Sequence, residues 1–373
     1  MKLIVAGGGT GGHLFPGIAV AEEFLSRDPA NEVLFVGSER GIEAKTIPQL
    51  GYRLELISAA GIRGKGSLAK LKGSFMMLYG YAQSRKILKE FKPDLVLGVG
   101  GYASLPMVLA AKGMNIPRYI HEQNALPGMS NKVLSRVANK VFISIEESAL
   151  FFPKGTTLLT GNPLRRQILE KLGARGQGPE AGTEEVSGPR TLAPGPCFRL
   201  FIFGGSQGAH ALNLAIPKAI AQLDLITRKQ LKITHQTGEK DLQEVTAAYR
   251  SIGCEAITRS FIDDMATEYS KADLIICRAG ATTIAEITAL GKACLFVPFP
   301  HATDDHQRKN AEALLKQGAC EMLLEQEITK DGLTRALANL MKNRDELQQI
   351  GERAANLARL DAAKVIVDEM VKG

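Results

Sequence analysis

The sequence predicts an α/β protein built from two similar domains that face each other across a cleft. Three observations indicate this class. The chain has 373 residues, more than one hydrophobic core comfortably serves. A strand, a glycine-rich loop and a helix follow one another at the start of each half, from Leu3 and again from Phe198. Between Leu274 and Asn310, two apolar runs flank a short amphipathic helix, as in a βαβ unit.

The composition limits the class of protein further. Hydrophobic residues make up 45% of the chain and charged residues 23%, as in ordinary globular proteins. No apolar run is long enough to span a bilayer, and the first one is too short for a signal peptide. The net charge of +7 predicts an anionic partner, such as a nucleotide, a lipid headgroup or a nucleic acid. We expect the cysteines to be reduced core residues of a cytoplasmic protein: Cys197, Cys254, Cys277, Cys294 and Cys320.

The first glycine loop follows a short apolar strand at 3–6. Gly7, Gly9 and Gly12 match the G-x-G-x-x-G pattern of dinucleotide-binding loops, and Pro16 suits the first position of the next helix. Glycines at this place let the backbone approach an anionic ligand closely. The loop therefore predicts a phosphate-binding site.

A NAD-dependent oxidoreductase would also need an acidic residue at the end of the second strand. That strand, at 33–36, runs into Gly37 and Ser38 instead. Glu39 is close enough to keep this alternative open.

Further βα units complete the first half. Strands are expected at 54–57, 95–98, 118–120, 141–143 and 157–159. A second glycine loop, at 98–102, enters a helix at Ser104, and His121 to Asn124 lie at the carboxyl end of their strand. In parallel sheets this edge is where ligands bind.

We expect the first domain to span residues 1–163 and the second to span residues 164–356. Residues 173–196 are rich in Gly, Pro, Glu and Ala and predict an exposed loop or linker. The last helix, at about 357–371, is a candidate to pack back on the first domain.

The βαβ unit of the second half contains a candidate ligand-binding carboxylate. Thr283 and Glu286 have the spacing of a capping box, which would start the helix, and Gly291 would end it. Two interpretations of Glu286 follow: its carboxylate caps the backbone at Thr283, or it accepts hydrogen bonds from the vicinal hydroxyls of a nucleotide ribose. Arg278 and Thr282 lie at the same edge of the predicted sheet.

Residues 64–91 mix apolar, aromatic and basic side chains. Phe75, Leu78 and Tyr81 lie among six basic residues: Lys65, Lys70, Lys72, Arg85, Lys86 and Lys89. This mixture suits the headgroup region of an anionic membrane. The alternative is a helix that packs on the sheet. We expect packing for Leu78 and Tyr81, and membrane contact for Phe75 and the basic residues.

Six motifs together resemble, in content and order, those of the MurG family. These bacterial glycosyltransferases add N-acetylglucosamine to a lipid-linked muramyl pentapeptide in peptidoglycan synthesis. The motifs are residues 7–13, 100–102, 121–131, 161–163, 204–209 and 278–286. The resemblance covers the chain outside residues 173–196. Leu105 departs from it, since the family usually has glycine there, which leaves the shape of the second loop open.

The resemblance implies a GT-B fold, with UDP-N-acetylglucosamine in the C-terminal domain and the acceptor in the N-terminal one. It implies inverting transfer to the 4-hydroxyl of the muramic acid of undecaprenyl-diphospho-muramoyl-pentapeptide. The implied donor-binding residues are Thr10, Gly11, Gly12, Arg165, Ser206, Gln207, Ile262, Met265, Arg278, Thr282, Glu286 and Gln307, with His306 as a further candidate. The implied acceptor-binding residues are Gly100, Gly101, Tyr102, His121, Asn124 and Asn131.

The resemblance also assigns parts of the donor to particular residues. Arg278 and Ile262 would lie at the uracil, Glu286 at the ribose hydroxyls, Ser206 with Gln207 at the diphosphate, and Gln307 at the sugar. It implies no tightly bound cofactor and no metal site, with stimulation by a divalent cation left open. The implied location is the cytoplasmic face of the inner membrane, as a peripheral protein. Other proteins of cell-wall synthesis are implied partners, and nucleic acid is not.

Inverting transfer needs a base that removes the acceptor proton. His13 ends the first glycine loop, and an unperturbed histidine titrates near physiological pH. We expect His13 to be this base, with His121 or Glu122 next in order. The alternative is that His13 only hydrogen-bonds the acceptor or the loop backbone.

Other functions share parts of this pattern. Another GT-B glycolipid sugar transferase or a UDP-N-acetylglucosamine epimerase would keep the diphosphate loop. A nucleotide-binding regulator without catalysis would keep the C-terminal site and have no use for His13 or the segment from His121 to Asn124.

Overall fold

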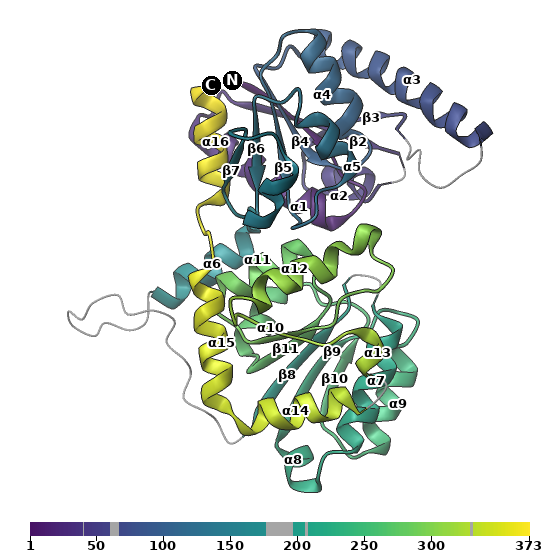
Figure 1. Ribbon diagram of the computed structural model, residues 1–373, viewed down its shortest axis with the longest axis vertical. Helices are drawn as coiled ribbons and strands as arrows, with labels where there is room; N and C mark the ends of the chain where they lie inside the picture. The colour runs from purple at the N-terminus through teal and green to yellow at the C-terminus, as the bar shows by residue number, and fades with distance from the viewer. Residues whose placement is uncertain (40, 60–66, 177–196, 206–207, 329–330) are drawn as a thin grey trace, which may run out of the picture. The chain divides into compact units, whose positions relative to one another are not determined.

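The computed structural model describes the chain except residues 40, 60–66, 177–196, 206–207 and 329–330. It divides the chain into two compact units, Met1–Arg166 with Arg359–Gly373, and Gln167–Ala358. Each unit contains one sheet whose strands all pair in parallel, with helices packed against it (Figure 1). The expected class, α/β with a Rossmann-like sheet in each half, is confirmed.

The sheet of the first unit has the order β3-β2-β1-β4-β5-β6-β7. Its strands are β1 (Lys2–Gly7), β2 (Glu32–Ser38), β3 (Arg53–Ile57), β4 (Leu95–Gly100), β5 (Arg118–Glu122), β6 (Lys140–Ile143) and β7 (Thr157–Leu159). The central strands are buried on both faces, which explains their continuous apolar runs. Strands β2 and β3 extend the sheet on one side of β1, and the chain then returns to place β4 on the other side. The carboxyl ends of β1 and β4 carry the two glycine loops.

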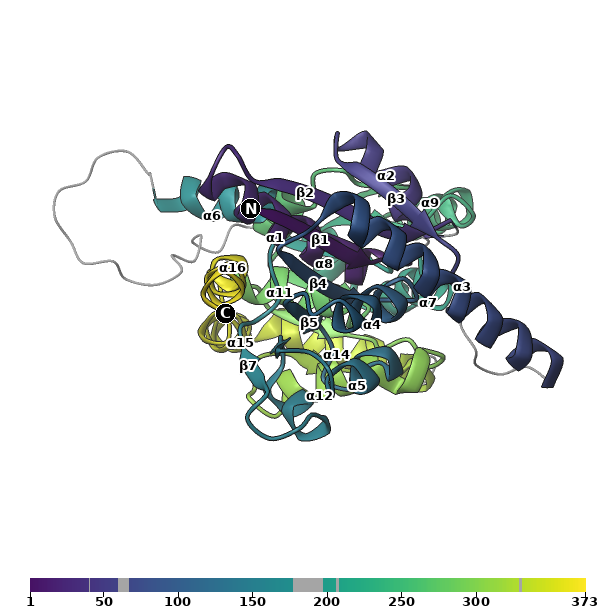
Figure 2. The ribbon, with the colours of Figure 1, turned by 90° about the horizontal axis from the view of Figure 1, so that it is seen from above.

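Helices cover both faces of this sheet. They are α1 (Gly11–Arg27), α2 (Glu43–Gln49), α3 (Ser67–Phe91), α4 (Ser104–Gly113), α5 (Met129–Leu134), the 3-10 helix η1 (Glu146–Phe151) and α16 (Ala362–Lys372). Side chains of α3, α4 and α5 share one core, and those of α1, α2 and α16 share the other. Figures 1 and 2 both show α3 running beside α4.

The helix after the first glycine loop begins earlier than expected. Helix α1 starts at Gly11, with Thr10 as its N-cap residue, whereas Pro16 was predicted at the first position. Pro16 instead lies buried inside the helix. This prediction was wrong because Gly11 and Gly12, the last two glycines of the loop, already belong to the first turn of the helix.

Helix α16 packs on the first unit through α1 and the sheet. Asp368 forms an ion pair with Arg27 at 3.0 Å, and Glu369 forms one with Lys140 at 2.6 Å. The backbone oxygen of Met370 accepts a hydrogen bond from Tyr119 at 3.3 Å. The end of the chain is thus part of the core that supports α1.

Three apolar side chains near the middle of α3 are exposed. Phe75, Leu78 and Tyr79 are 70%, 69% and 54% exposed. The expectation that Leu78 packs on the sheet is therefore wrong, while Tyr81 packs against the core as expected. Arg85, Lys86 and Lys89 are exposed on the same helix. Lys65 and the side chains of Lys70 and Lys72 lie outside the described residues.

The sheet of the second unit has the order β10-β9-β8-β11-β12-β13. Its strands are β8 (Phe198–Phe203), β9 (Leu231–Gln236), β10 (Ala256–Arg259), β11 (Leu274–Cys277), β12 (Cys294–Phe296) and β13 (Glu321–Met322). Alternate side chains of β8 point to opposite faces of the sheet. Leu200 and Ile202 enter the larger core, whereas Phe201 and Phe203 contact Tyr269 on the other face.

The helices of this unit are α6 (Arg166–Gly176), α7 (His210–Ala221), α8 (Leu225–Gln230), α9 (Leu242–Ser251), α10 (Met265–Lys271), α11 (Ala281–Ala289), η2 (Thr303–Asp305), α12 (His306–Leu315), α13 (Glu325–Ile328), α14 (Gly332–Lys342) and α15 (Arg344–Asn356). Because α6 continues to Gly176, the predicted linker starts too early at Gly173. The rest of that linker lies outside the described residues.

Within the described part of the chain, no helix has both the length and the apolar character needed to cross a bilayer.

Candidate active site

Two glycine loops of the first unit pack directly against each other. Gly7 and Gly101 have φ values of 144° and 80°, which strain any other residue. A Cβ on Gly7 would lie 2.2 Å from the oxygen of Gly100, and one on Gly101 would lie 2.4 Å from the oxygen of Gly8. Glycine is therefore required here by the close approach of the loops as well as by any ligand. This packing brings the carboxyl ends of β1 and β4 together.

His13 lies in the first turn of α1, beside these loops. Its Nδ1 is 3.3 Å from the hydroxyl oxygen of Thr10. A Cβ on Gly100 would lie 2.7 Å from the Cδ2 of His13, so the ring is packed against the second glycine loop. His13 is half-buried, as expected for a side chain that both packs and faces solvent. Thr10 is exposed, and Gly11 and Gly12 are half-buried in the same turn.

Glu122 ends β5 and is buried, with a relative exposure of 1%. Its carboxylate accepts four hydrogen bonds: from the backbone and side-chain nitrogens of Asn124 at 3.0 and 3.2 Å, from the backbone of Gly128 at 3.1 Å and from Asn131 at 2.9 Å. A carboxylate offers about four lone-pair positions. The structure thus brings together two residues expected at the acceptor, Asn124 and Asn131, and Glu122 is their common partner.

His121 precedes Glu122 and is fully buried. The Gln123 side-chain amide donates to its Nδ1 at 3.0 Å, which places the ring proton on Nε2, 3.3 Å from the Gly161 oxygen. Burial lowers the pKa of His121 from 6.5 to about 4, and His13 nearby contributes to the shift. The ring is therefore neutral near pH 7, and its unprotonated nitrogen is already in use.

The remaining acceptor candidate, Tyr102, lies on the rim of this site. It is 56% exposed and follows Gly101 directly. Leu105, the position that departs from the family pattern, packs at the edge of the core under α4. The second loop keeps its glycine conformation at Gly100 and Gly101 with leucine at this position.

Glu43 is a site residue that the sequence analysis missed. It is 1% exposed, and its carboxylate accepts hydrogen bonds from the backbone of Gly9 at 2.7 Å and from the backbone and hydroxyl of Ser38 at 2.9 and 3.0 Å. The first glycine loop is thus tied to the end of β2 by a carboxylate. Ser38 and Glu43 are five residues apart across the strand-to-helix turn, a separation that no simple motif marks.

Glu286 lies on α11 in the second unit and is 2% exposed. Helix α11 begins at Ala281 with Gly280 as its N-cap, so the predicted capping box at Thr283 is wrong. The carboxylate instead accepts a hydrogen bond from the hydroxyl of Tyr269 at 3.1 Å. Thr282 is half-buried in the first turn of the same helix. The capping interpretation of Glu286 is excluded because Glu286 lies beyond the first turn.

Arg278 follows β11 and is held by the loop after β12. Its guanidinium donates to the backbone oxygens of Val297 and Pro298 at 3.0 and 3.1 Å and forms an ion pair with Glu325. It also lies 5.3 Å from the ring centroid of Phe299. The backbone of Phe299 in turn donates to Gln307 at 3.0 Å. Two expected donor residues, Arg278 and Gln307, are therefore linked through this loop.

Gln236, which the sequence analysis also missed, joins two loops of the second unit. Its amide nitrogen donates to the Gly205 oxygen at 3.0 Å, and its amide oxygen accepts from the backbone of Ile262 at 2.8 Å. Gln236 ends β9 and is buried. Its single side chain thus fixes the expected diphosphate loop against the segment from Ile262 to Met265.

The expected donor residues are divided between the two units. Ile262, Met265, Arg278, Thr282, Glu286 and Gln307 belong to the second unit, as does the half-buried His306, whereas Thr10, Gly11, Gly12 and Arg165 belong to the first. Arg165 lies 5.4 Å from the ring centroid of Phe15. Ser206 and Gln207 lie outside the described residues.

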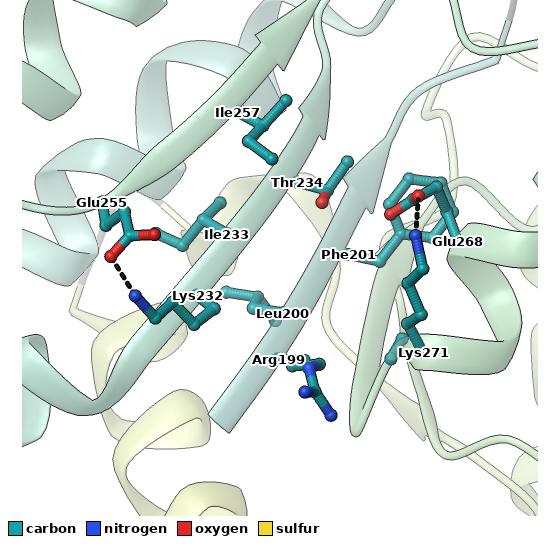
Figure 3. Close-up of a pocket in the computed structure, with 11 residues that line it drawn as sticks. Arg199, Leu200, Phe201, Lys232, Ile233, Thr234, Glu255, Ile257, Glu268 and Lys271 are labelled. Carbon is teal, nitrogen blue, oxygen red and sulfur yellow. Dashed lines mark hydrogen bonds and ion pairs between the residues drawn. The ribbon is translucent and has the colours of Figure 1, made fainter. Parts of the chain in front are cut away.

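A cavity of about 200 Å³ lies at the opposite end of the second sheet (Figure 3). Figure 3 shows an ion pair between Lys232 and Glu255 on one side and one between Lys271 and Glu268 on the other. Arg199, Lys232 and Glu255 lie at or before the amino ends of β8, β9 and β10. Ligands of parallel sheets bind at the carboxyl ends, so this cavity is distinct from the candidate site.

Comparison with known proteins assigns the family. Residues 3–143 match the N-terminal domain of glycosyltransferase family 28, and residues 199–366 match its C-terminal domain. The chain therefore belongs to glycosyltransferase family 28.

Particular relatives share its whole length. A protein of Trichlorobacter lovleyi is 76% identical over 100% of this chain and 98% of its own, and one of Pelobacter propionicus is 61% identical over 100% and 99%. Both are named UDP-N-acetylglucosamine–N-acetylmuramyl-(pentapeptide) pyrophosphoryl-undecaprenol N-acetylglucosamine transferase.

Solved structures agree with this fold. Acinetobacter baumannii MurG has a TM-score of 0.79 at 32% identity, over 100% of this chain and 99% of its own. The expected GT-B fold is confirmed by this match. The UDP-GlcNAc 2-epimerase of Neisseria meningitidis has a TM-score of 0.66 at 14% identity, over all of both chains, and shares the fold alone.

Proposed function

We infer that this chain transfers N-acetylglucosamine from UDP-N-acetylglucosamine to the muramic acid of undecaprenyl-diphospho-muramoyl-pentapeptide, the lipid I to lipid II step of peptidoglycan synthesis. The observation that carries this inference is identity of 76% along the whole chain to a protein named for that activity. The family is a glycosyltransferase family, and both of its domains match.

On the donor side, we propose that Glu286 binds the ribose hydroxyls and that the loop before α7 meets the diphosphate. A buried carboxylate, fixed by Tyr269, suits a pair of hydroxyl donors. Loop amides and the N-terminus of a helix favour negative charge, which supports placing the diphosphate at the start of α7. In the same proposal, the uracil lies at Arg278 and Ile262, and Gln307 binds the sugar.

On the acceptor side, we propose that His13 is the general base and that Glu122 positions Asn124 and Asn131. The 4-hydroxyl oxygen of the muramic acid attacks the anomeric carbon as its proton passes to His13, while the bond from that carbon to the UDP oxygen breaks and its electrons leave with UDP. His121 and Glu122 are less suited to accept this proton, because their acceptor positions are engaged by neighbouring donors.

We propose that leaving-group charge is stabilised by backbone amides and a helix N-terminus without a tightly bound metal. Electrostatic stabilisation by preorganised donors is often the largest single contribution to catalysis. Transfer measured after exhaustive chelation with EDTA tests this. Retained turnover, with any effect of added magnesium limited to stimulation, is expected. Abolished turnover that only a divalent cation restores contradicts it.

We propose reversible binding to an anionic membrane surface through the apolar face of α3. The support is the exposure of Phe75, Leu78 and Tyr79 next to Arg85, Lys86 and Lys89. A polyprenyl-linked acceptor lies in a bilayer, so an enzyme that acts on it gains from such contact. Contacts with other proteins of cell-wall synthesis stay a proposal drawn from the resemblance to the family.

The decisive experiment is incubation of the protein with labelled UDP-N-acetylglucosamine and a muramyl-pentapeptide lipid analogue. We expect label in the lipid fraction and UDP release that depends on the acceptor. Conversion of UDP-N-acetylglucosamine to its C2 epimer without acceptor would indicate the epimerase alternative. Absence of both reactions, with retained binding of UDP, would indicate a regulator.

A further inference from the structure

The side chain of Tyr269 connects Glu286 to the core of the second unit. Tyr269 is 1% exposed, and its ring packs edge-on against Phe201 and Phe203 with centroid distances of 5.7 Å in both pairs. Its hydroxyl donates to Oε2 of Glu286 at 3.1 Å. Burial and these two ring contacts restrict the ring, so the hydroxyl favours one orientation of the carboxylate.

The helix that carries Tyr269 is itself anchored at both ends. Asp264 caps the N-terminus of α10 by accepting from a backbone N–H at 3.0 Å. The ammonium of Lys292 donates to the backbone oxygens of Ser270 and Ala272, at 2.7 and 2.9 Å, at the other end. Lys292 lies three residues after the end of α11, the helix that carries Glu286. The two helices are therefore fixed to each other by side chains.

We propose that Tyr269 is a positioning residue for the donor nucleotide. Its hydroxyl aims the Glu286 carboxylate at the vicinal ribose hydroxyls and so determines the preference for a ribonucleotide over its deoxy analogues. This inference rests on the proposed function, in which Glu286 binds the ribose. A carboxylate oxygen has two lone pairs, so Oε2 accepts from Tyr269 while the group still accepts from ribose.

Removal of the hydroxyl alone should loosen the carboxylate without opening the core. In Tyr269→Phe the ring still packs on Phe201 and Phe203, whereas Glu286 loses a charge-assisted hydrogen bond and gains rotational freedom. A hydrogen bond to a charged group is typically worth about one to two orders of magnitude in an equilibrium constant. We therefore expect binding of UDP to weaken roughly ten-fold.

The test is the ratio of dissociation constants for UDP and 2′-deoxy-UDP, measured by calorimetry on the full chain. We expect the wild type to prefer UDP and Tyr269→Phe to lose most of that preference, because the deoxy analogue has one ribose contact fewer to lose. In turnover, the KM for UDP-N-acetylglucosamine should rise while kcat at saturating donor stays within about two-fold. A variant that keeps the wild-type ratio would overturn the inference.

Tyr249→Phe is the matched control. Tyr249 is also 1% exposed, and its hydroxyl is 3.0 Å from Nδ1 of His235 in the core on the other face of the sheet. The same atom is removed at the same depth, and the ribose preference should stay at the wild-type value. Equal loss of preference in both variants would mean general loosening of the unit and would contradict a specific role for Tyr269.

Glu286→Gln separates this inference from the proposed function. If the wild type and Glu286→Gln show the same ratio, Glu286 does not read the ribose, and both proposals fail. If Glu286→Gln abolishes the preference and Tyr269→Phe preserves it, the role of Glu286 stands and only the role of Tyr269 fails.

Discussion

At the scale of single residues, buried carboxylates organise the candidate residues within each unit. Glu43, Glu122 and Glu286 are each at most 2% exposed. Burial of a carboxylate is tolerated only where hydrogen-bond donors replace water. Backbone amides and a hydroxyl donate hydrogen bonds to Glu43, and four N–H groups donate to Glu122. The phenol of Tyr269 donates to Glu286. These contacts suit the carboxylates to holding loops and neighbouring side chains in place. Proton transfer is better suited to a more accessible side chain such as His13.

His13 is the residue on which turnover should depend most strongly. Replacing it with alanine removes the proposed base and leaves the donor site of the second unit intact. We expect kcat at saturating substrates to fall by about 10²–10⁴-fold, the usual contribution of general-base catalysis. The dissociation constant of UDP and the melting temperature serve as controls and should stay near their wild-type values. Turnover within a few-fold of wild type would remove His13 as the base.

Glu43 should affect stability and acceptor use together. In Glu43→Gln an amide NH₂ would replace one of the oxygens that accept from Gly9 and Ser38, which leaves buried donors facing each other. Such a change typically costs about 1–3 kcal/mol in the free energy of unfolding. Because Gly9 belongs to the first glycine loop, the acceptor KM should rise more than the donor KM. Denaturant unfolding and steady-state kinetics in each substrate check this, and an unchanged acceptor KM would contradict it.

At the scale of elements, α3 combines a buried part and an exposed apolar part in one helix. Its second half contributes Ile87, Leu88 and Phe91 to the core, while its first half exposes Phe75 and Leu78. The sequence alone did not separate these, because apolar residues occur along the whole helix. Which residues of α3 are buried depends on where the helix packs against α4 and the sheet.

Leu78→Ser should therefore reduce membrane binding without unfolding the protein. The residue is already exposed, so the folded state loses little. Burial of a leucine in a bilayer is worth about 1.5–3 kcal/mol, so partitioning onto anionic phospholipid vesicles should fall roughly ten-fold. Leu150→Ser is the matched control, since Leu150 is 86% exposed on η1 of the same unit. Equal loss in both variants, or none in either, would contradict a specific role for α3. Vesicle sedimentation measures the partitioning.

At the scale of the whole molecule, each unit contains one buried histidine that is neutral. Burial lowers the pKa of His121 to about 4 and that of His235 to about 3 from a normal value of 6.5. In the unfolded chain these rings take up protons below pH 6.5, whereas in the folded chain they do not. Acidification through this range therefore favours unfolding.

The pH dependence of stability follows from this difference. Above pH 6.5 these histidines should leave the free energy of unfolding nearly unchanged. Between pH 6.5 and 4 that free energy should fall, by about 3 kcal/mol for His121 alone. Denaturant unfolding at a series of pH values measures this loss. The slope of the free energy of unfolding against pH counts the protons taken up on unfolding, and His121→Gln should lower it by about one proton in that range. An identical slope in the variant would show that His121 is not the source.

Much of the architecture was predictable because local patterns determine it. Buried parallel strands appear in the sequence as apolar runs, and a glycine loop marks the start of each half. The seven strands of the first sheet were therefore predicted close to their observed bounds, as were β8, β11 and β12 of the second, whereas β9, β10 and β13 were not predicted. The start of α1 and the capping box at Thr283 were wrong, since helix starts depend on backbone contacts that sequence spacing does not reveal. The helices α1 and α11 begin five and three residues earlier than the spacing indicates.

By itself, the sequence determined the class of each half, the glycine loops and the residue types available for chemistry, because those features depend on local periodicity and on side chains. The tertiary structure alone decided which partners these residues have: Glu43 with Gly9, Gln236 with Gly205 and Ile262, and Tyr269 with Glu286. Each pair is distant along the chain and adjacent in space. Parallel strands, joined by long crossovers, bring such residues to one edge of a sheet, and only the folded chain selects which of them meet.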